Sequence, residues 1–420
     1  MPTTFRPLDP TCEHVASPLG IDTRKPRFGW KLEGSVKGVS QSARQVQVAT
    51  DPGLLNETPD CWDSGRVESD QSVDVEYAGK ALKPRRTYHW RCRYWDHRGS
   101  ESEWSEVTTF ETGKMDEAWE ANWIGRSAYG KKPLSPSPYL RKAFALEKRP
   151  VRARVYITAG GVYAMSLNGK PVSADRFVPG WTDYERRFQY LTYDVTRLLK
   201  NGDNALGVVL GEGWYCGRFG LSRVMKSSYG KFPVVKLELH VEFADGSGEL
   251  IRSDRSWTAS KGAILSSSIY DGEFYDARKE LGDWDGPGFD DSSWDKVSSY
   301  KDTGVPIEAK RCAPVRPVEE LKTVAITESS EGNPIFDLGQ NMVGVPRLRL
   351  KENSGKKIVL RFAELLQDNG DLYTENYRSA KSTDTYIGKG GGNEVYEPYF
   401  TFHGFRYVEV RGMTGKPTQS

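Results

Sequence analysis

Apolar and polar residues alternate with a period of two along most of the chain. Because successive side chains of a strand point to opposite faces of a sheet, this pattern is typical of half-buried antiparallel strands. The clearest segments are 43–50 (ARQVQVAT), 87–95 (TYHWRCRYW), 153–167, 234–243 (VVKLELHVEF), 357–362 and 405–412. The pattern predicts an all-β fold.

The segments between these predicted strands have the composition of turns. Gly, Asn and Asp gather there, as hairpin and loop turns require. Examples are 167–170 (LNGK), 200–204 (KNGDN), 244–248 (ADGSG) and 389–393 (KGGGN). One short segment, 194–200 (DVTRLLK), has helical character, with Asp194 or Thr196 as its cap.

The spacing of strands and turns predicts three tandem β-sandwich modules. Residues 1–114 hold about seven short strands, a count that suits an immunoglobulin-like or fibronectin-like sandwich. A polar connector that contains 130–138 (GKKPLSPSP) follows. Residues 120–310 are predicted to form a longer jelly-roll-like module, and residues 314–420 a third β-sandwich.

Length and charge narrow the functional classes. A chain of 420 residues exceeds the size of one hydrophobic core, which agrees with several modules. Its 59 basic and 57 acidic residues are interleaved and leave a net charge of +2, so we expect no nucleic-acid partner. The sequence shows neither a signal peptide nor an apolar run of transmembrane length, so we expect a cytoplasmic protein without a membrane partner.

The cysteines do not form a recognisable metal or disulfide pattern. Their spacing includes no C-x-x-C pair and suits neither a zinc site nor a dense disulfide framework. We expect reduced, buried thiols at Cys12, Cys61, Cys92, Cys216 and Cys312. The sequence also lacks the G-x-S-x-G, H-E-x-x-H and P-loop motifs.

Two turns combine large aromatic rings with charged groups. They are 179–187 (PGWTDYERR) and 211–220 (GEGWYCGRFG). An aromatic face can stack on the C–H face of a sugar, while Arg and Asp hydrogen-bond its hydroxyl groups. The candidate sugar-binding residues are Trp181, Asp183, Arg187, Trp214, Tyr215 and Arg218. Core or inter-module packing is an equally open interpretation of the two Trp residues, because such large rings are usually well buried.

Acidic residues form three local clusters. They pair Glu273 with Asp276, Asp283 with Asp285, and Asp290 with Asp291. We expect these acids to serve turns and caps, where solvent keeps their pKa values ordinary. No D-x-D-x-D-G spacing is present, so we expect no cofactor, with calcium as a minor alternative. For His403, we expect a packed strand residue.

Several longer motifs carry a family resemblance that spans essentially the whole chain. In order along the sequence, they resemble the N-terminal modules of bacterial α-L-rhamnosidases of glycoside hydrolase family 78. The first sandwich is represented by 60–72 and 88–113, and a rhamnose-binding-type jelly roll by 167–220, 269–280 and 284–294. The third module is represented by 336–350, 361–387 and 400–410.

The resemblance implies a function and also a missing part. The family's catalytic domain is an (α/α)₆ barrel that follows the third module and uses acidic residues for inversion. The chain has no run of long amphipathic helices, so we expect no catalytic residues in it. We expect a region that recognises L-rhamnose or rhamnosides and supports the catalytic barrel. The alternatives are a scaffold protein that binds no sugar, and an enzyme with an active site inside the β-modules.

Overall fold

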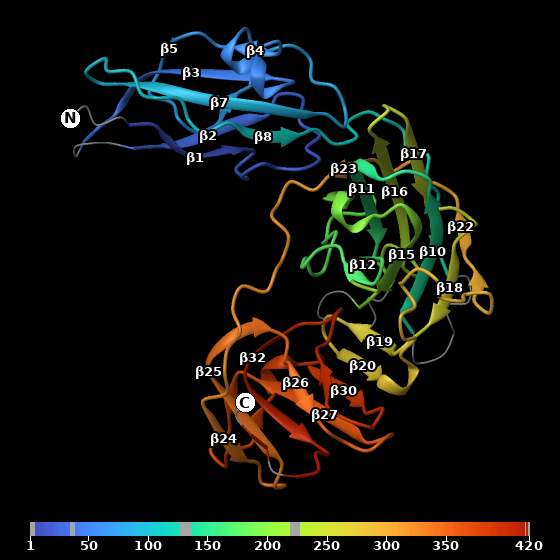
Figure 1. The fold of residues 1–420 in the computed structure, drawn as a ribbon. Coiled ribbons are helices and arrows are strands. Elements are labelled where there is room, and N and C mark those ends of the chain that lie inside the picture. Colours follow the sequence, from blue (N-terminus) through green and yellow to red (C-terminus); the bar gives the residue numbers. More distant parts are fainter. Residues whose placement is uncertain (1–4, 34–37, 127–135, 219–226, 416, 419–420) are drawn as a thin grey trace. The chain divides into compact units, whose positions relative to one another are not determined.

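The computed structural model describes residues 5–33, 38–126, 136–218, 227–415 and 417–418, and β-strands form its framework (Figure 1). The helical elements within these residues are short 3-10 turns: η1 (Pro52–Asn56), η2 (Thr196–Leu198), η3 (Ala277–Lys279) and η4 (Glu375–Tyr377). The all-β prediction is therefore confirmed. No helix in the described part of the chain is long and apolar enough to cross a membrane.

The segment predicted to be helical is one of these short turns. The N-cap residue of η2 is Val195, so the prediction of Asp194 or Thr196 as the cap is wrong. The Asp194 carboxylate nevertheless accepts hydrogen bonds from the Thr196 backbone N–H at 2.9 Å and from its hydroxyl at 2.6 Å. Residues 127–135, which make up most of the predicted polar connector, lie outside the described residues.

The described chain divides into two compact units. The first is Met1–Trp119 together with Glu308–Cys312, and the second is Glu120–Ile307 together with Ala313–Ser420. The middle and third predicted modules therefore share the second unit, while their exact boundaries stay predictions.

The first unit is a sandwich of two sheets. One sheet has the order β1 (Pro7–Cys12), β2 (Arg27–Leu32), β6 (Val75–Glu76). The other has the order β4 (Trp62–Asp63), β3 (Gln41–Ala49), β7 (Thr87–Asp96), β8 (Thr108–Glu111), with β5 (Val67–Glu68) also on β3. The inward residues of β7 include Trp90, which lies 4.5 Å, between ring centroids, from Phe28 of β2. Burial of such rings is a main source of the unit's stability.

The outward face of β7 carries an alternating stack of guanidinium groups and indole rings. Arg91 and Arg93 lie over the ring of Trp104, at 4.3 and 4.5 Å from its centroid. Arg93 and Arg66 lie over Trp95, at 5.0 and 4.9 Å. Side chains two residues apart on a strand share a face, so the sequence R-C-R-Y-W places Arg91, Arg93 and Trp95 side by side.

Two further sheets form the middle sandwich in the second unit. One has the order β13 (Lys170–Pro171), β12 (Val162–Leu167), β15 (Gly202–Gly211), β10 (Pro138–Leu146), β18 (Thr258–Lys261), β21 (Asp295–Lys296). The other includes β22 (Ser298–Tyr300), β9 (Trp123–Gly125), β16 (Val234–Phe243), β11 (Pro150–Gly160), β14 (Phe188–Asp194), with β17 (Gly248–Arg252) on β16. Alternate residues such as Val208, Leu237 and Leu239 meet in one buried core. In β23 (Ile307–Ala309) the chain passes back to the first unit.

The period-two segment 153–167 is two strands rather than one. Its backbone breaks at Gly161, between β11 and β12, with φ of 123°. Only glycine adopts this conformation readily, so the apolar pattern continues across a break in the strand.

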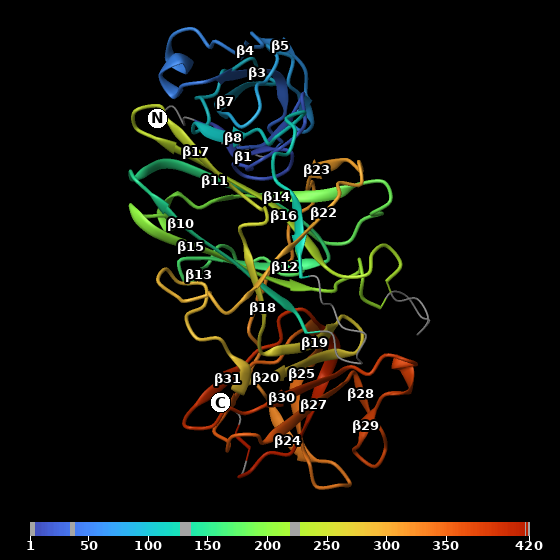
Figure 2. The same ribbon diagram turned by 90° about the vertical axis from the view of Figure 1, so that its right-hand side faces the viewer.

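The last large sheet uses strands from two distant parts of the sequence. Its order is β19 (Ile264–Ser268), β20 (Gly272–Asp276), β30 (Thr383–Ile387), β27 (Lys357–Ala363), β32 (His403–Arg411), β25 (Pro334–Gly344), β24 (Ala325–Glu328). Small two-stranded sheets join β26 (Leu348–Leu350) to β31 (Glu394–Tyr396), and β28 (Leu365–Leu366) to β29 (Leu372–Tyr373). The β19–β20 hairpin belongs by sequence to the predicted middle module, yet β20 pairs in parallel with β30 (Figure 2).

The cysteines only partly follow the sequence prediction. None of the five forms a disulfide; Cys12, Cys92 and Cys216 are buried and Cys61 is half-buried. For Cys312 the prediction of burial is wrong, because this residue lies in a polar segment without a strand and is exposed.

The ring of Tyr215 lies against Gly160 and Gly230, so a larger residue at either glycine should destabilise the second unit. A Cβ at Gly230 would lie 2.0 Å from Tyr215 Cε1, whereas a Cβ at Gly392 would meet no atom within 4 Å. We predict that Gly230→Ala lowers the free energy of unfolding by about 1–3 kcal/mol. Gly392→Ala should change it by less than about 0.5 kcal/mol. Thermal and urea unfolding of both variants would test this, and equal stability of the two variants would contradict the prediction.

Candidate functional site

The turn at 179–187 presents part of the predicted site to solvent. Tyr184 is its buried anchor: its hydroxyl donates to the Gly180 carbonyl at 2.7 Å. The Asp183 carbonyl accepts from the N–H groups of Arg186 and Arg187, both at 3.0 Å. Trp181 projects from this frame with 53% of its surface exposed, and Asp183 and Arg187 are exposed as well.

The second predicted stretch is mostly committed to packing. Trp214 is half-buried beside Val162, Ile264 and Phe400. Tyr215 belongs to a different cluster, where its ring makes an edge contact with Tyr184 at 5.1 Å between centroids. The packing interpretation therefore describes Trp214, and the last two residues of the stretch, 219–220, lie outside the described residues.

Arg218 is a buried connector between distant loops. Its guanidinium donates to Asp271 Oδ1 at 2.8 Å and to the Ser379 carbonyl at 3.0 Å. The residue is only 8% exposed, so these contacts leave little of it accessible to a ligand. In the described part of the chain, neither of the two cavities described below collects the six predicted residues: Tyr215 lines one of them, and none lines the other.

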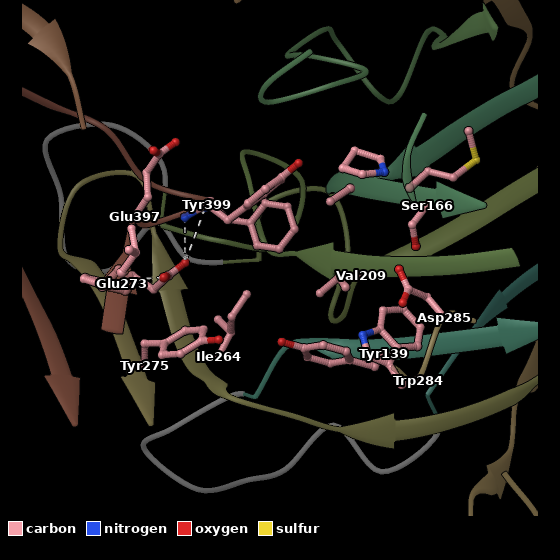
Figure 3. Close-up of a pocket in the computed structure, with 16 residues that line it drawn as sticks. Tyr139, Ser166, Val209, Ile264, Glu273, Tyr275, Trp284, Asp285, Glu397 and Tyr399 are labelled. Atoms are coloured by element: carbon pink, nitrogen blue, oxygen red, sulfur yellow. Dashed lines mark hydrogen bonds between the residues drawn. The ribbon is translucent and has the colours of Figure 1, made fainter. Parts of the chain in front are cut away.

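A cavity of about 270 Å³ lies instead at the junction of the middle sandwich and the last large sheet. Figure 3 shows Tyr139, Trp284 and Asp285 on one side and Glu273, Glu397 and Tyr399 on the other. The aromatic lining is Tyr139, Tyr275, Trp284, Tyr396, Tyr399 and Phe400, and the polar lining includes Ser166, Asp285, Glu273 and Glu397. We name it the junction cavity.

The Glu273 carboxyl ties the two sides of the junction cavity together. Its Oε2 accepts from the backbone N–H groups of Tyr399 and Phe400 at 3.1 and 3.4 Å. Its Oε1 accepts from the Tyr396 hydroxyl at 3.2 Å. Burial raises the pKa of Glu273 to about 8, and the nearby Asp384 carboxylate adds to the rise.

For Glu273 the prediction of a solvated turn acid with an ordinary pKa is therefore wrong. The residue lies inside β20 with 2% of its surface exposed. Asp276 and Asp290 do serve turns, because they accept from the backbone N–H groups of Arg278 and Ser292 at 3.2 and 3.0 Å. The ordinary pKa predicted for both is wrong, because hydrogen bonds from the Arg278 side chain and from the Ser292 backbone lower the pKa of Asp276 and of Asp290 respectively. No group of three or more His, Cys, Asp and Glu residues in the described segments is arranged to hold a metal ion.

A buried polar chain lies behind Glu273. The Glu273 backbone N–H donates to Asp384 Oδ1 at 2.8 Å, and His403 Nε2 lies 3.1 Å from Asp384 Oδ2. His403 Nδ1 lies 3.1 Å from the Ser382 hydroxyl, and its ring stacks on Phe362 at 4.0 Å between centroids. This confirms His403 as a packed strand residue of β32.

Two arginines pair with Glu397, another of the acidic residues in the wall. Arg347 Nε lies 3.0 Å from Glu397 Oε2, and Arg176 forms an ion pair with Glu397 Oε1. The Arg176 guanidinium also lies 4.2 Å from the centroid of the Tyr399 ring. These contacts hold Glu397 and Tyr399 in fixed positions at the edge of the junction cavity.

Sequence reasoning missed this cavity for an identifiable reason. Its walls come from residues far apart in the chain, and the bond from Glu273 to Asp384 spans 111 positions. The available signal was a lone Glu between Gly272 and Phe274 in an aromatic strand, IYDGEFYD. An acid on the buried face of a strand is rare without a partner, and that rarity could have marked it.

Comparisons with known proteins identify relatives for each part of the chain. Family models match at residues 7–116 (Rha78A-like, N-terminal immunoglobulin domain), 148–319 (α-L-rhamnosidase N-terminal domain) and 327–420 (bacterial α-L-rhamnosidase concanavalin-like domain). An α-L-rhamnosidase of Alteromonas sp. (strain LOR) is 42% identical over 413 residues, which cover 96% of this chain and 44% of the relative.

Solved structures give the same result. The structure of a Streptomyces avermitilis α-L-rhamnosidase complexed with L-rhamnose matches with a TM-score of 0.94 and 34% identity, over 98% of this chain and 56% of that one. An α-L-rhamnosidase from Dictyoglumus thermophilum matches with a TM-score of 0.91 and 39% identity, over 98% and 48%. The chain thus spans about half the length of these relatives.

The raised pKa of Glu273 predicts a pH-dependent stability. The folded value of about 8 exceeds the ordinary value of 4.5, so this contribution is complete below pH 4.5 and is lost as the pH rises toward 8. In the unchanged protein the free energy of unfolding should fall by at least about 1 kcal/mol between about pH 5 and pH 8, and the melting temperature should fall with it. Glu273→Gln should reduce this fall in melting temperature. Glu328→Gln, an exposed change on β24, is the control. If the melting temperatures of all three proteins changed with pH in the same way, the raised pKa of Glu273 would be contradicted.

Proposed function

The chain belongs to the α-L-rhamnosidase family and corresponds to its N-terminal modules, and from this premise we propose that it recognises rhamnosides and supports a catalytic barrel. The barrel would hydrolyse terminal α-L-rhamnose from glycosides, while the modules described here bind and position. The observation that carries the recognition is the aromatic and acidic lining of the junction cavity.

The chemistry of this lining suits a sugar ring. The C–H face of a sugar stacks on rings such as Trp284, Tyr275 and Tyr399, and Asp285 and Ser166 can bond to its hydroxyl groups. A volume of about 270 Å³ lies near the lower end of the usual range for ligand pockets, so it suits one ring rather than a long oligosaccharide. The wall is preformed, because hydrogen bonds hold Glu273, Tyr396 and Tyr399 together before any ligand arrives.

The Streptomyces avermitilis relative was solved in complex with L-rhamnose, which supports the same ligand class here. Two surfaces compete for it: the junction cavity and the exposed turn of Trp181, Asp183 and Arg187. The cavity can enclose a ring, whereas the turn offers one exposed indole. A scaffold without sugar affinity is the alternative function, since Trp214, Tyr215 and Arg218 mainly serve packing.

Rhamnose binding can be assigned to one of the two surfaces by matched tryptophan variants. We predict that Trp284→Ala weakens binding of L-rhamnose by about 1–3 kcal/mol in titration calorimetry, as expected for a central aromatic anchor. Trp181→Ala should leave the affinity unchanged. Asp285→Asn should also weaken it, which covers the case of a poorly folded Trp284 variant.

If only Trp181→Ala weakened the binding of L-rhamnose, the binding site would be the turn at 179–187 rather than the junction cavity. No heat from the unchanged protein would favour the scaffold alternative. Far-UV circular dichroism of each variant is the control for folding.

We predict that the 420-residue chain does not hydrolyse a chromogenic rhamnoside by itself. An inverting glycosidase needs two carboxyl groups about 6.5–9.5 Å apart that face the substrate from opposite sides. In the junction cavity, Glu273 is already held by Tyr396, Tyr399 and Phe400. Turnover that survives repurification and disappears in Glu273→Gln would show an active site within the β-modules.

A further inference from the structure

The middle sandwich contains a second cavity, of about 200 Å³, that the proposed rhamnoside site does not use. We name it the aromatic cavity. Its lining is Trp123, Phe188, Tyr215, Phe232, Val234 and Tyr300, with Lys231, Lys301 and Thr303. Four of these residues are terminal residues of strands in one sheet: Trp123 of β9, Phe188 of β14, Val234 of β16 and Tyr300 of β22. A site built on strand ends is held more rigidly than one built on loops.

The walls of the aromatic cavity are fixed by ring contacts. Trp123 lies 4.8 Å, between ring centroids, from Phe188, and Phe232 lies 4.8 Å from Tyr300. Tyr215 is held between Gly160 and Gly230, where an added Cβ would lie 2.8 and 2.0 Å from its ring. These contacts hold the side chains in place, so a bound ring would cost little ordering of the protein.

The polar part of the lining is positively charged. Lys231 and Lys301 are exposed residues on this cavity, and none of its lining residues in the described part of the chain is acidic. Asp302, next to Lys301, has its carboxylate 2.5 Å from the Nζ atom of Lys236. That neighbouring negative charge is therefore already paired with a different lysine.

The two cavities of the second unit thus differ in charge. The junction cavity has the acidic residues Glu273, Asp285 and Glu397 and no lysine or arginine in its described lining, whereas the aromatic cavity has two lysines and no acid there. The aromatic cavity combines flat apolar walls with two ammonium groups, a combination that suits an aromatic ring carrying a negative charge. An apolar cavity of roughly 150 Å³ holds one benzene ring, so about 200 Å³ accommodates a ring with a short substituent.

We propose that the aromatic cavity binds an aromatic carboxylate, with the ring between Trp123, Phe232 and Tyr300 and the carboxylate at Lys231 and Lys301. This site is distinct from the proposed rhamnoside site and does not depend on it.

The test compares 4-hydroxycinnamate with its neutral amide on the full 420-residue chain. Binding is measured by titration calorimetry and by quenching of tryptophan fluorescence. The carboxylate should bind at least about tenfold more tightly than the amide at low salt, and added NaCl should reduce this difference. Phe232→Ala should weaken the binding of both ligands, because it removes part of the cavity wall.

The lysines are tested by a matched pair of double variants. The double variant Lys231→Ala with Lys301→Ala should bind the carboxylate about tenfold more weakly and bind the amide with unchanged affinity. Lys296→Ala with Lys351→Ala removes two exposed lysines elsewhere and should change neither ligand. No binding of 4-hydroxycinnamate by the unchanged chain, or equal losses in both double variants, would overturn the proposal. Because L-rhamnose is absent from these measurements, the result does not depend on whether the junction cavity binds it.

Discussion

The second unit depends on the parallel pairing of β20 with β30, which places Phe274 opposite Thr385 and Tyr275 opposite Tyr386. This pairing attaches a hairpin from the predicted middle module to the sheet of the third. It brings Glu273 against the backbone of Tyr399 and Phe400, where the carboxyl closes one wall of the junction cavity. Because β20 and β30 are hydrogen-bonded neighbours in one sheet, the two modules cannot separate without breaking this sheet. The ion pair of Arg176 with Glu397 and the hydrogen bond from Arg218 to the Ser379 carbonyl join the same two modules, which lie in one compact unit.

The same arrangement explains why two cavities in one unit have opposite chemistry. The junction cavity lies where two modules meet and collects carboxyl groups that serve first as ties between them, such as Glu273 and Glu397. The aromatic cavity lies at the strand ends of a single sheet and needs no such ties, so its wall consists of ring contacts. Structural demands of the junction therefore determine which polar side chains line its cavity.

Local sequence patterns could predict the strands but not the sites. The segments 87–95 and 234–243 correspond to β7 and β16. In β7 the alternation follows the buried face, whereas in β16 the polar residues Lys236 and Glu238 are buried as well. Alternation failed at Gly161, where the backbone breaks while the apolar pattern continues. The turn at 179–187 exposes Trp181, Asp183 and Arg187, whereas Trp214 packs in a cluster with Phe400, which lies 186 positions later. Composition cannot distinguish a ring that binds a ligand from a ring that joins two modules.

The alternating stack on β7 of the first unit affects how this chain behaves in concentrated solution. Without the arginines, Trp95 and Trp104 would form an exposed hydrophobic patch on the outward face of the sheet. Such a patch promotes association between molecules. Arg66, Arg91 and Arg93 cover these rings with permanent positive charge. Arg91 Nε donates to Gln47 Oε1 and Arg93 Nε donates to Gln45 Oε1, each at 2.9 Å, so the glutamines hold these two guanidinium groups in place. The stack thus keeps a tryptophan-bearing face wettable, and a charge-neutral replacement of Arg93 would be felt first as a loss of colloidal stability, before any loss of fold.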